Sequence, residues 1–133
     1  MFSVEERVQM LNDVVRMITG EEAPTLLNPM SSVEVSSFEG IYLVNYAHRI
    51  GATHLLRGIR SAEDFGFENA IRHINEDIDP RIETVYLIPP RHLCEVSSST
   101  VKGLIGPAGW RDVVKKLVPP PVFACLTERF GDG

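Results

Sequence analysis

The chain has 133 residues, which predicts one domain with enough length to bury a hydrophobic core. Its formal net charge of -5 argues against a general nucleic-acid binder, so any anion site must be a local cluster of arginine or lysine. The sequence has two cysteines without a paired spacing, no signal-peptide pattern and no apolar run of membrane-spanning length. We therefore expect a cytoplasmic protein with no membrane span and no nucleic-acid partner.

The first quarter of the chain predicts a helix followed by a loop. Ser3 and Glu6 have the spacing of a capping box, and apolar residues then recur at helical spacing from Val4 to Ile18. Gly20 ends this helix. Prolines and small polar residues predict a loop over 23–32, and the alternation at 33–35 predicts a short strand.

The middle of the chain alternates helices with strands. A helix is predicted over 41–50, ended by glycine, and a short apolar strand over 53–56. A loop at 57–60 follows, and a capping pattern at Ser61 then predicts a helix as far as Asp77. The β-rich run at 84–88, stopped by two prolines, is the clearest strand.

The last third is predicted to be helical. Serines at 97–99 cap a helix through Ile105, glycines at 106 and 109 interrupt it, and a final helix covers 122–129. Short alternating strands and helices predict an α/β fold with a Rossmann-like parallel sheet and helices on both faces, in a single domain over 1–133. In such a sheet the ligand binds beyond the carboxyl ends of the strands.

One candidate anion site is the segment Arg57-Gly58-Ile59-Arg60, which follows the first of these strands. Glycine allows the backbone to approach a ligand closely, and the two guanidinium groups offer bidentate donors to phosphate oxygens. The same sequence is also consistent with two surface arginines in a turn that bind no ligand.

Two further features admit both a binding and a structural interpretation. Ser97, Ser98 and Ser99 stand at a helix start, where hydroxyls and free backbone N–H groups can hold an anion, although the segment taken alone favours plain helix capping. Glu68 lies one turn beyond Asp64 and could accept hydrogen bonds from a ribose, pair with an arginine, or be a solvated surface carboxylate. The histidines show no metal-ligand spacing, and neither cysteine has a visible activating neighbour.

Together these segments resemble the phosphopantetheine adenylyltransferases, of the HxGH nucleotidylyltransferase superfamily. The segment Phe2 to Arg7 is similar to the family's F-S/T-x-E-E-R helix start, and Arg57 to Arg60 is similar to its R-G-I/L-R. Asp64 to Glu68 is similar to its D-F-x-Y/F-E. The remaining similar positions are Asn45 to Ala47, Gly51 to Thr53, Asn75, Pro89 and Val96 to Lys102.

The resemblance implies adenylyl transfer from ATP to 4′-phosphopantetheine, giving dephospho-coenzyme A and pyrophosphate in coenzyme A biosynthesis, with Mg²⁺ accompanying ATP. It implies that Arg57 holds the pantetheine phosphate and that Leu43 contacts the same substrate. ATP would be bound by Gly58, Ile59, Arg60, Glu68, Leu93, Cys94, Glu95, Val96, Ser97, Ser98 and Ser99. The family forms hexamers, so a homo-oligomer is expected, and coenzyme A is a further expected ligand.

The sequence also departs from the family pattern. No stretch matches G-T/S-F-D-P-x-x-x-G-H, whose histidine stabilises the transition state, so the first strand-helix segment is expected to be lacking and no catalytic residue is assigned. Leu93 and Glu95 stand where the family usually has aromatic residues, and Gly103 where it often has glutamate. Two alternatives stay open: a non-catalytic homologue that binds nucleotide or coenzyme A, and a nucleotidylyltransferase with another phosphate acceptor.

Overall fold

The computed structural model describes residues 2–20 and 32–131, and these fall into two units. One unit contains the described residues up to Ser37 together with those from Ser97 onward, and the other runs from Phe38 to Val96. The prediction of one domain over 1–133 therefore stays a prediction. No helix in the described ranges is both long enough and apolar enough to cross a membrane.

The first unit is helical and is made of α1 (Val4–Thr19), α4 (Ser98–Leu104), α5 (Trp110–Val114) and α6 (Pro120–Phe130). α1 begins as predicted, because the Ser3 hydroxyl accepts from the Glu6 N–H while the Glu6 carboxylate accepts from the Ser3 N–H. α6 begins earlier than predicted, since proline fixes a helical φ in the first turn, where its missing N–H is not needed.

The core of the first unit forms around the single tryptophan. Trp110, Val114, Val101 and Leu126 are all buried and in one cluster, and Phe123 packs against it. α5 can turn into this cluster because Gly109, just before it, has a φ of 82°, a conformation that glycine adopts without steric cost. The sequence patterns did not predict α5, which is too short for a periodic signal.

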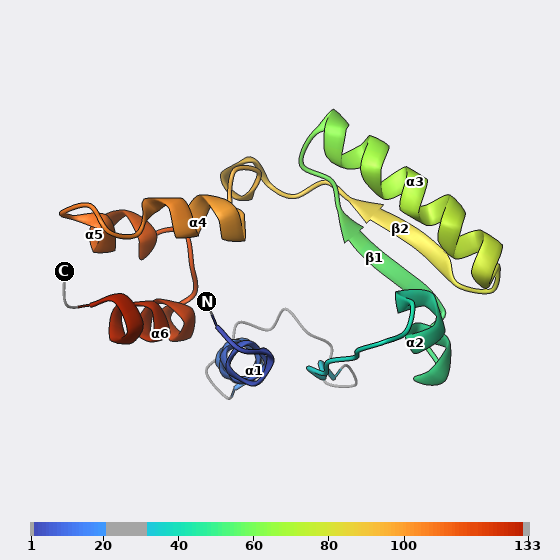
Figure 1. Ribbon diagram of the computed structural model, residues 1–133, viewed down its shortest axis with the longest axis horizontal. Coiled ribbons are helices and arrows are strands. Elements are labelled where there is room, and N and C mark those ends of the chain that lie inside the picture. The colour runs from blue at the N-terminus through green and yellow to red at the C-terminus, as the bar shows by residue number, and fades with distance from the viewer. Residues whose placement is uncertain (1, 21–31, 132–133) are drawn as a thin grey trace. The chain divides into compact units, whose positions relative to one another are not determined.

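The second unit is a strand–helix–strand arrangement preceded by a short helix (Figure 1). Its elements are α2 (Leu43–Arg49), β1 (His54–Gly58), α3 (Ala62–Ile78), β2 (Glu83–Leu87) and a 3-10 turn, Arg91–Leu93. The two strands are parallel, with Leu55 opposite Thr84 and Arg57 opposite Tyr86. The predicted α/β class with a parallel sheet is thus confirmed.

The two helices of this unit pack on one face of its sheet. Val44 and Ala47 of α2 form a buried cluster with Leu55 of β1 and with Ile82. α3 contacts the same face, where Glu68 meets Arg57 and Phe65 meets Tyr86. Leu56, Val85 and Leu87 alternate with these positions and are exposed within the unit.

Two sequence predictions are corrected by the structure. Residues 33–35 are described and form no strand; alternation alone cannot make a strand where no neighbour pairs with it. The loop predicted at 57–60 begins two residues later in the structure, because Arg57 and Gly58 pair with Tyr86 and Leu87 and so belong to β1.

Candidate functional site

The candidate site lies at the carboxyl end of β1, where the chain turns into α3. Gly58 ends the strand, and the Ile59 N–H donates to the Leu87 carbonyl oxygen at 2.8 Å, so the sheet pairing continues one residue past the strand. The Ser61 hydroxyl then caps α3 by accepting from the Asp64 N–H at 3.1 Å. The strand end and the helix start therefore place Arg57 and Arg60 in a fixed backbone frame.

Arg57 forms a bidentate ion pair with Glu68 of α3. Its Nε donates to Glu68 Oε2 at 2.7 Å and its Nη2 donates to Oε1 at 2.5 Å. The Glu68 side chain is 14% exposed and that of Arg57 is 40% exposed. The hydrogen bonds that Arg57 donates to Glu68 raise the pKa of the Arg57 guanidinium, with burial opposing this effect.

Tyr86 stands opposite Arg57 on the neighbouring strand. Its ring meets Phe65 edge to face, with centroids 5.7 Å apart. Among the described residues its hydroxyl is the one buried side-chain polar atom without a hydrogen-bond partner. A buried hydroxyl without a partner costs folding free energy, so the Tyr86 hydroxyl destabilises the sheet next to Arg57.

A small cavity of about 60 Å³ brings three of the predicted site residues together. Leu43, at the start of α2, shares it with Arg57 and Glu68. The rest of the lining is Leu55, Ile71, Arg72, Asn75 and Thr84. The structure thus combines an apolar wall with a charged pair in a cavity lined by α2, α3 and the two strands.

Arg60 is held by Asp64 and by the loop that follows β2. Its Nε donates to Asp64 Oδ2 at 2.9 Å, and its Nη1 donates to the Val96 carbonyl oxygen at 3.3 Å. The Arg60 N–H also donates to Asp64 Oδ2, at 3.2 Å. These bonds lower the pKa of the Asp64 carboxyl and raise that of the Arg60 guanidinium.

The loop from Pro89 to Val96 is shaped by backbone hydrogen bonds around the 3-10 turn. The Leu93 N–H donates to the Pro90 carbonyl, and the Val96 N–H donates to the Leu93 carbonyl. The Cys94 thiol lies 3.6 Å from the Pro90 carbonyl oxygen, and Leu93 and Glu95 are exposed. The sequence did not predict this turn, which has only three residues.

Comparison with known proteins identifies the family. The chain is 41% identical over 131 residues to the phosphopantetheine adenylyltransferase of Chromobacterium violaceum, covering 98% of this chain and 73% of that protein. The chain belongs to the phosphopantetheine adenylyltransferase family.

Other members of the phosphopantetheine adenylyltransferase family match over smaller shares. The protein of Neisseria meningitidis serogroup C is 42% identical over 92% of this chain and 65% of its own length. That of Lacticaseibacillus casei is 40% identical over 67% of this chain and 52% of its own length. No protein-family model matches the chain. The chain thus spans roughly half to three quarters of these family members.

The serines that the family resemblance assigns to ATP belong to the first unit. The Ser97 hydroxyl caps α4, accepting from the Thr100 N–H at 3.0 Å, so its capping role is observed directly. Ser98 and Ser99 are exposed in the first turn. That these serines and Arg60 grip one triphosphate stays a prediction, because they belong to different units.

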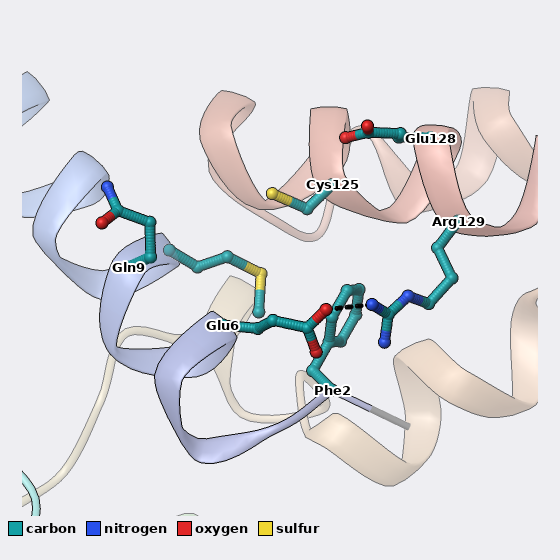
Figure 2. Close-up of a pocket in the computed structure, with 7 residues that line it drawn as sticks. Phe2, Glu6, Gln9, Cys125, Glu128 and Arg129 are labelled. Atoms are coloured by element: carbon teal, nitrogen blue, oxygen red, sulfur yellow. Dashed lines mark hydrogen bonds and ion pairs between the residues drawn. The ribbon is translucent and has the colours of Figure 1, made fainter.

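A second, larger pocket lies in the first unit between α1 and α6 (Figure 2). It has a volume of about 340 Å³ and is lined by Phe2, Glu6, Gln9, Met10, Cys125, Glu128 and Arg129. Arg129 pairs with Glu6 and stacks over the Phe2 ring at 4.2 Å from its centroid. Two carboxylates against one arginine make this pocket a poor phosphate site.

Sequence reasoning missed the partners rather than the arginines. It left the partner of Glu68 open and did not single out Tyr86, whose position opposite Arg57 depends on strand register. Asp64 carried a signal, because an acid four residues after Arg60 at a helix start can reach back to it. The pairing of Glu6 with Arg129 joins opposite ends of the chain and left no local signal.

Proposed function

We propose that the chain takes part in adenylyl transfer from ATP to 4′-phosphopantetheine, yielding dephospho-coenzyme A and pyrophosphate. The observation that carries this proposal is the end of β1, where Arg57 shares a cavity with Leu43 and Arg60 follows on the turn into α3. Relatives named phosphopantetheine adenylyltransferase, 40–42% identical to the chain, support the same reaction.

The reaction asks the protein for positioning and charge stabilisation. A phosphate oxygen of 4′-phosphopantetheine forms a bond to the α-phosphorus of ATP while the bond from that phosphorus to the pyrophosphate oxygen breaks. In the proposal Arg57 holds the acceptor phosphate and Leu43 contacts the acceptor. Gly58, Ile59 and Arg60 bind ATP with the loop residues Leu93, Cys94, Glu95, Val96, Ser97, Ser98 and Ser99.

Mg²⁺ enters the proposal as part of the substrate. The described residues contain no cluster of three histidine, cysteine, aspartate or glutamate side chains that could hold a metal ion. Bound to the triphosphate of ATP, Mg²⁺ neutralises its charge without needing such a cluster. A cytoplasmic location and self-association of the chain belong to the same proposal.

Two measurements on the same preparation test it. Calorimetric titration with 4′-phosphopantetheine and with Mg²⁺-ATP should show binding of both, and a mass-based assay should detect dephospho-coenzyme A. Binding of both ligands with background turnover would make the chain a non-catalytic binder. Turnover with a different member of a panel of phosphate acceptors would replace the acceptor, and no binding of either ligand would end the proposal.

A further inference from the structure

Glu68 is engaged on one edge of the Arg57 guanidinium and leaves the other edge open. A guanidinium has two edges that can meet an anion through two N–H groups: one formed by Nε and Nη2, the other by Nη1 and Nη2. Glu68 occupies the first edge with both carboxylate oxygens, at 2.7 and 2.5 Å. Nη1 has no partner among the described residues.

The unpartnered Nη1 is accessible to solvent, whereas the Glu68 carboxylate is largely buried. In the described residues only the Tyr86 hydroxyl is both buried and unpartnered, so the unpartnered Nη1 reaches solvent. Arg57 is 40% exposed, whereas Glu68 is 14% exposed and lies on a 17-residue helix. A rigid element thus supplies the anchor, and the outer end of the arginine is left for a ligand.

We propose that Glu68 is a positioning residue, which fixes Arg57 through Nε and Nη2 so that the Nη1 edge meets the phosphate of the acceptor substrate. This inference rests on the proposed function. It differs from the role that the family resemblance implies for Glu68, which is direct contact with ATP. Both Glu68 oxygens already accept from Arg57, so the carboxylate is engaged before any ligand binds.

The physical gain is the ordering of a long side chain before the ligand arrives. A free arginine must give up rotamer freedom when it grips a phosphate, and that loss weakens binding. An arginine already held by a carboxylate has lost most of that freedom. The affinity for the phosphate group should therefore depend on Glu68 only as long as Arg57 is present.

A double-mutant cycle tests this dependence. Calorimetry measures the affinities for 4′-phosphopantetheine and for pantetheine, whose ratio isolates the phosphate group, in the unmodified chain, Glu68→Ala, Arg57→Ala and the double variant. We expect Glu68→Ala to lower the ratio by about two- to tenfold, the range that corresponds to ordering one long side chain. In the Arg57→Ala background the same change should leave the ratio unaltered.

Further variants separate positioning from loss of fold or of charge. Glu68→Gln keeps one carbonyl oxygen to accept from Arg57 and should retain an intermediate ratio, with a melting curve close to that of the unmodified chain. Asp112→Asn removes one negative charge from an exposed pair with Lys115 on α5 and should leave the ratio unchanged.

Three results would overturn the inference. An equal fall in the ratio with and without Arg57 would mean that Glu68 contacts the ligand directly. A rise in the ratio for Glu68→Ala would mean that Glu68 competes with the phosphate for Arg57. In both cases the proposed function stands, whereas an unmodified chain that does not discriminate the two ligands would remove the acceptor site itself.

Discussion

Arg57 and Arg60 differ in how much of each guanidinium is already engaged. Arg60 donates through Nε, Nη1 and Nη2 to Asp64 and Val96, whereas Arg57 donates only through Nε and Nη2, to Glu68. Of the five guanidinium N–H donors, Arg60 therefore has two left for a ligand phosphate and Arg57 has three.

Replacing either arginine by alanine should weaken ligand binding. If both contact phosphates, Arg57→Ala and Arg60→Ala should each cost about 1.5–3 kcal/mol of binding free energy, the scale of a hydrogen bond to a charged group. Calorimetric titration with 4′-phosphopantetheine for the first variant and with Mg²⁺-ATP for the second measures this. Arg16→Ala, an exposed arginine on α1, is the control. Unchanged affinities would leave Arg57 and Arg60 as surface charges.

Removing the Tyr86 hydroxyl should stabilise the second unit. The hydroxyl is buried without a partner, so Tyr86→Phe removes an unsatisfied group and keeps the ring against Phe65. We expect the free energy of unfolding to rise by about 1 kcal/mol, the lower end of the cost of such a group. Urea unfolding measures it, with Tyr42→Phe, 65% exposed, as the neutral control. A loss of stability would reveal a partner for the hydroxyl.

At the scale of elements, Asp79 ties the end of α3 to α2. It is 6% exposed and accepts from Arg81 Nε and Nη2, both at 2.8 Å, and the Nδ1 of His48 on α2 lies 3.2 Å away. The Arg81 hydrogen bonds lower the pKa of Asp79 from its ordinary 3.8 to about 2. Since the folded-state pKa is the lower one, the charged carboxylate stabilises the fold.

This shift predicts a loss of stability in acid. The contribution of Asp79 is present above its unfolded-state pKa of 3.8 and disappears as the pH falls towards about 2. Asp79→Asn should therefore lower the melting temperature at neutral pH and flatten its dependence on pH between about 4 and 2. Thermal melting across this range tests it. Parallel curves for the two proteins would mean that Asp79 carries no pH-dependent stability.

Local patterns predicted the elements whose signals are local. The capping residues Ser3, Ser61 and Ser97 each mark a helix start, and the β-rich run before Pro89 marks β2. Features that depend on distant partners were not predictable in this way. The extension of β1 to Gly58 comes from pairing with β2, and 33–35 forms no strand because no described residue pairs with it.

The candidate site shows the same division between local and tertiary information. Its arginines follow from a four-residue pattern at a strand end, which the family resemblance also marks. The pairing of Arg57 with Glu68 needs α3 folded back on the sheet, and the orphan hydroxyl of Tyr86 needs the strand register. Sequence patterns therefore named the charged residues but not the contacts that set their geometry.

At the scale of the whole molecule, each unit has its own buried cluster. Trp110→Ala should destabilise the first unit by about 3–5 kcal/mol, because it leaves a large cavity among Val101, Val114 and Leu126. Val44→Ala should cost the second unit about 1.5–3 kcal/mol, since a smaller side chain is removed. Hydrogen exchange resolved by peptide measures both. Equal loss of protection in 38–96 and 97–131 for each variant would show that the two clusters unfold together.

The aromatic residues are divided between the units in a way that labels them. The sequence has one tryptophan, Trp110, in the first unit, and three tyrosines, Tyr42, Tyr46 and Tyr86, in the second. Indole fluorescence excited at its long-wavelength edge therefore reports on the first unit alone, and phenol emission on the second. Excitation transfer from phenol to indole then gives a spectroscopic ruler between the two, without any dye being attached.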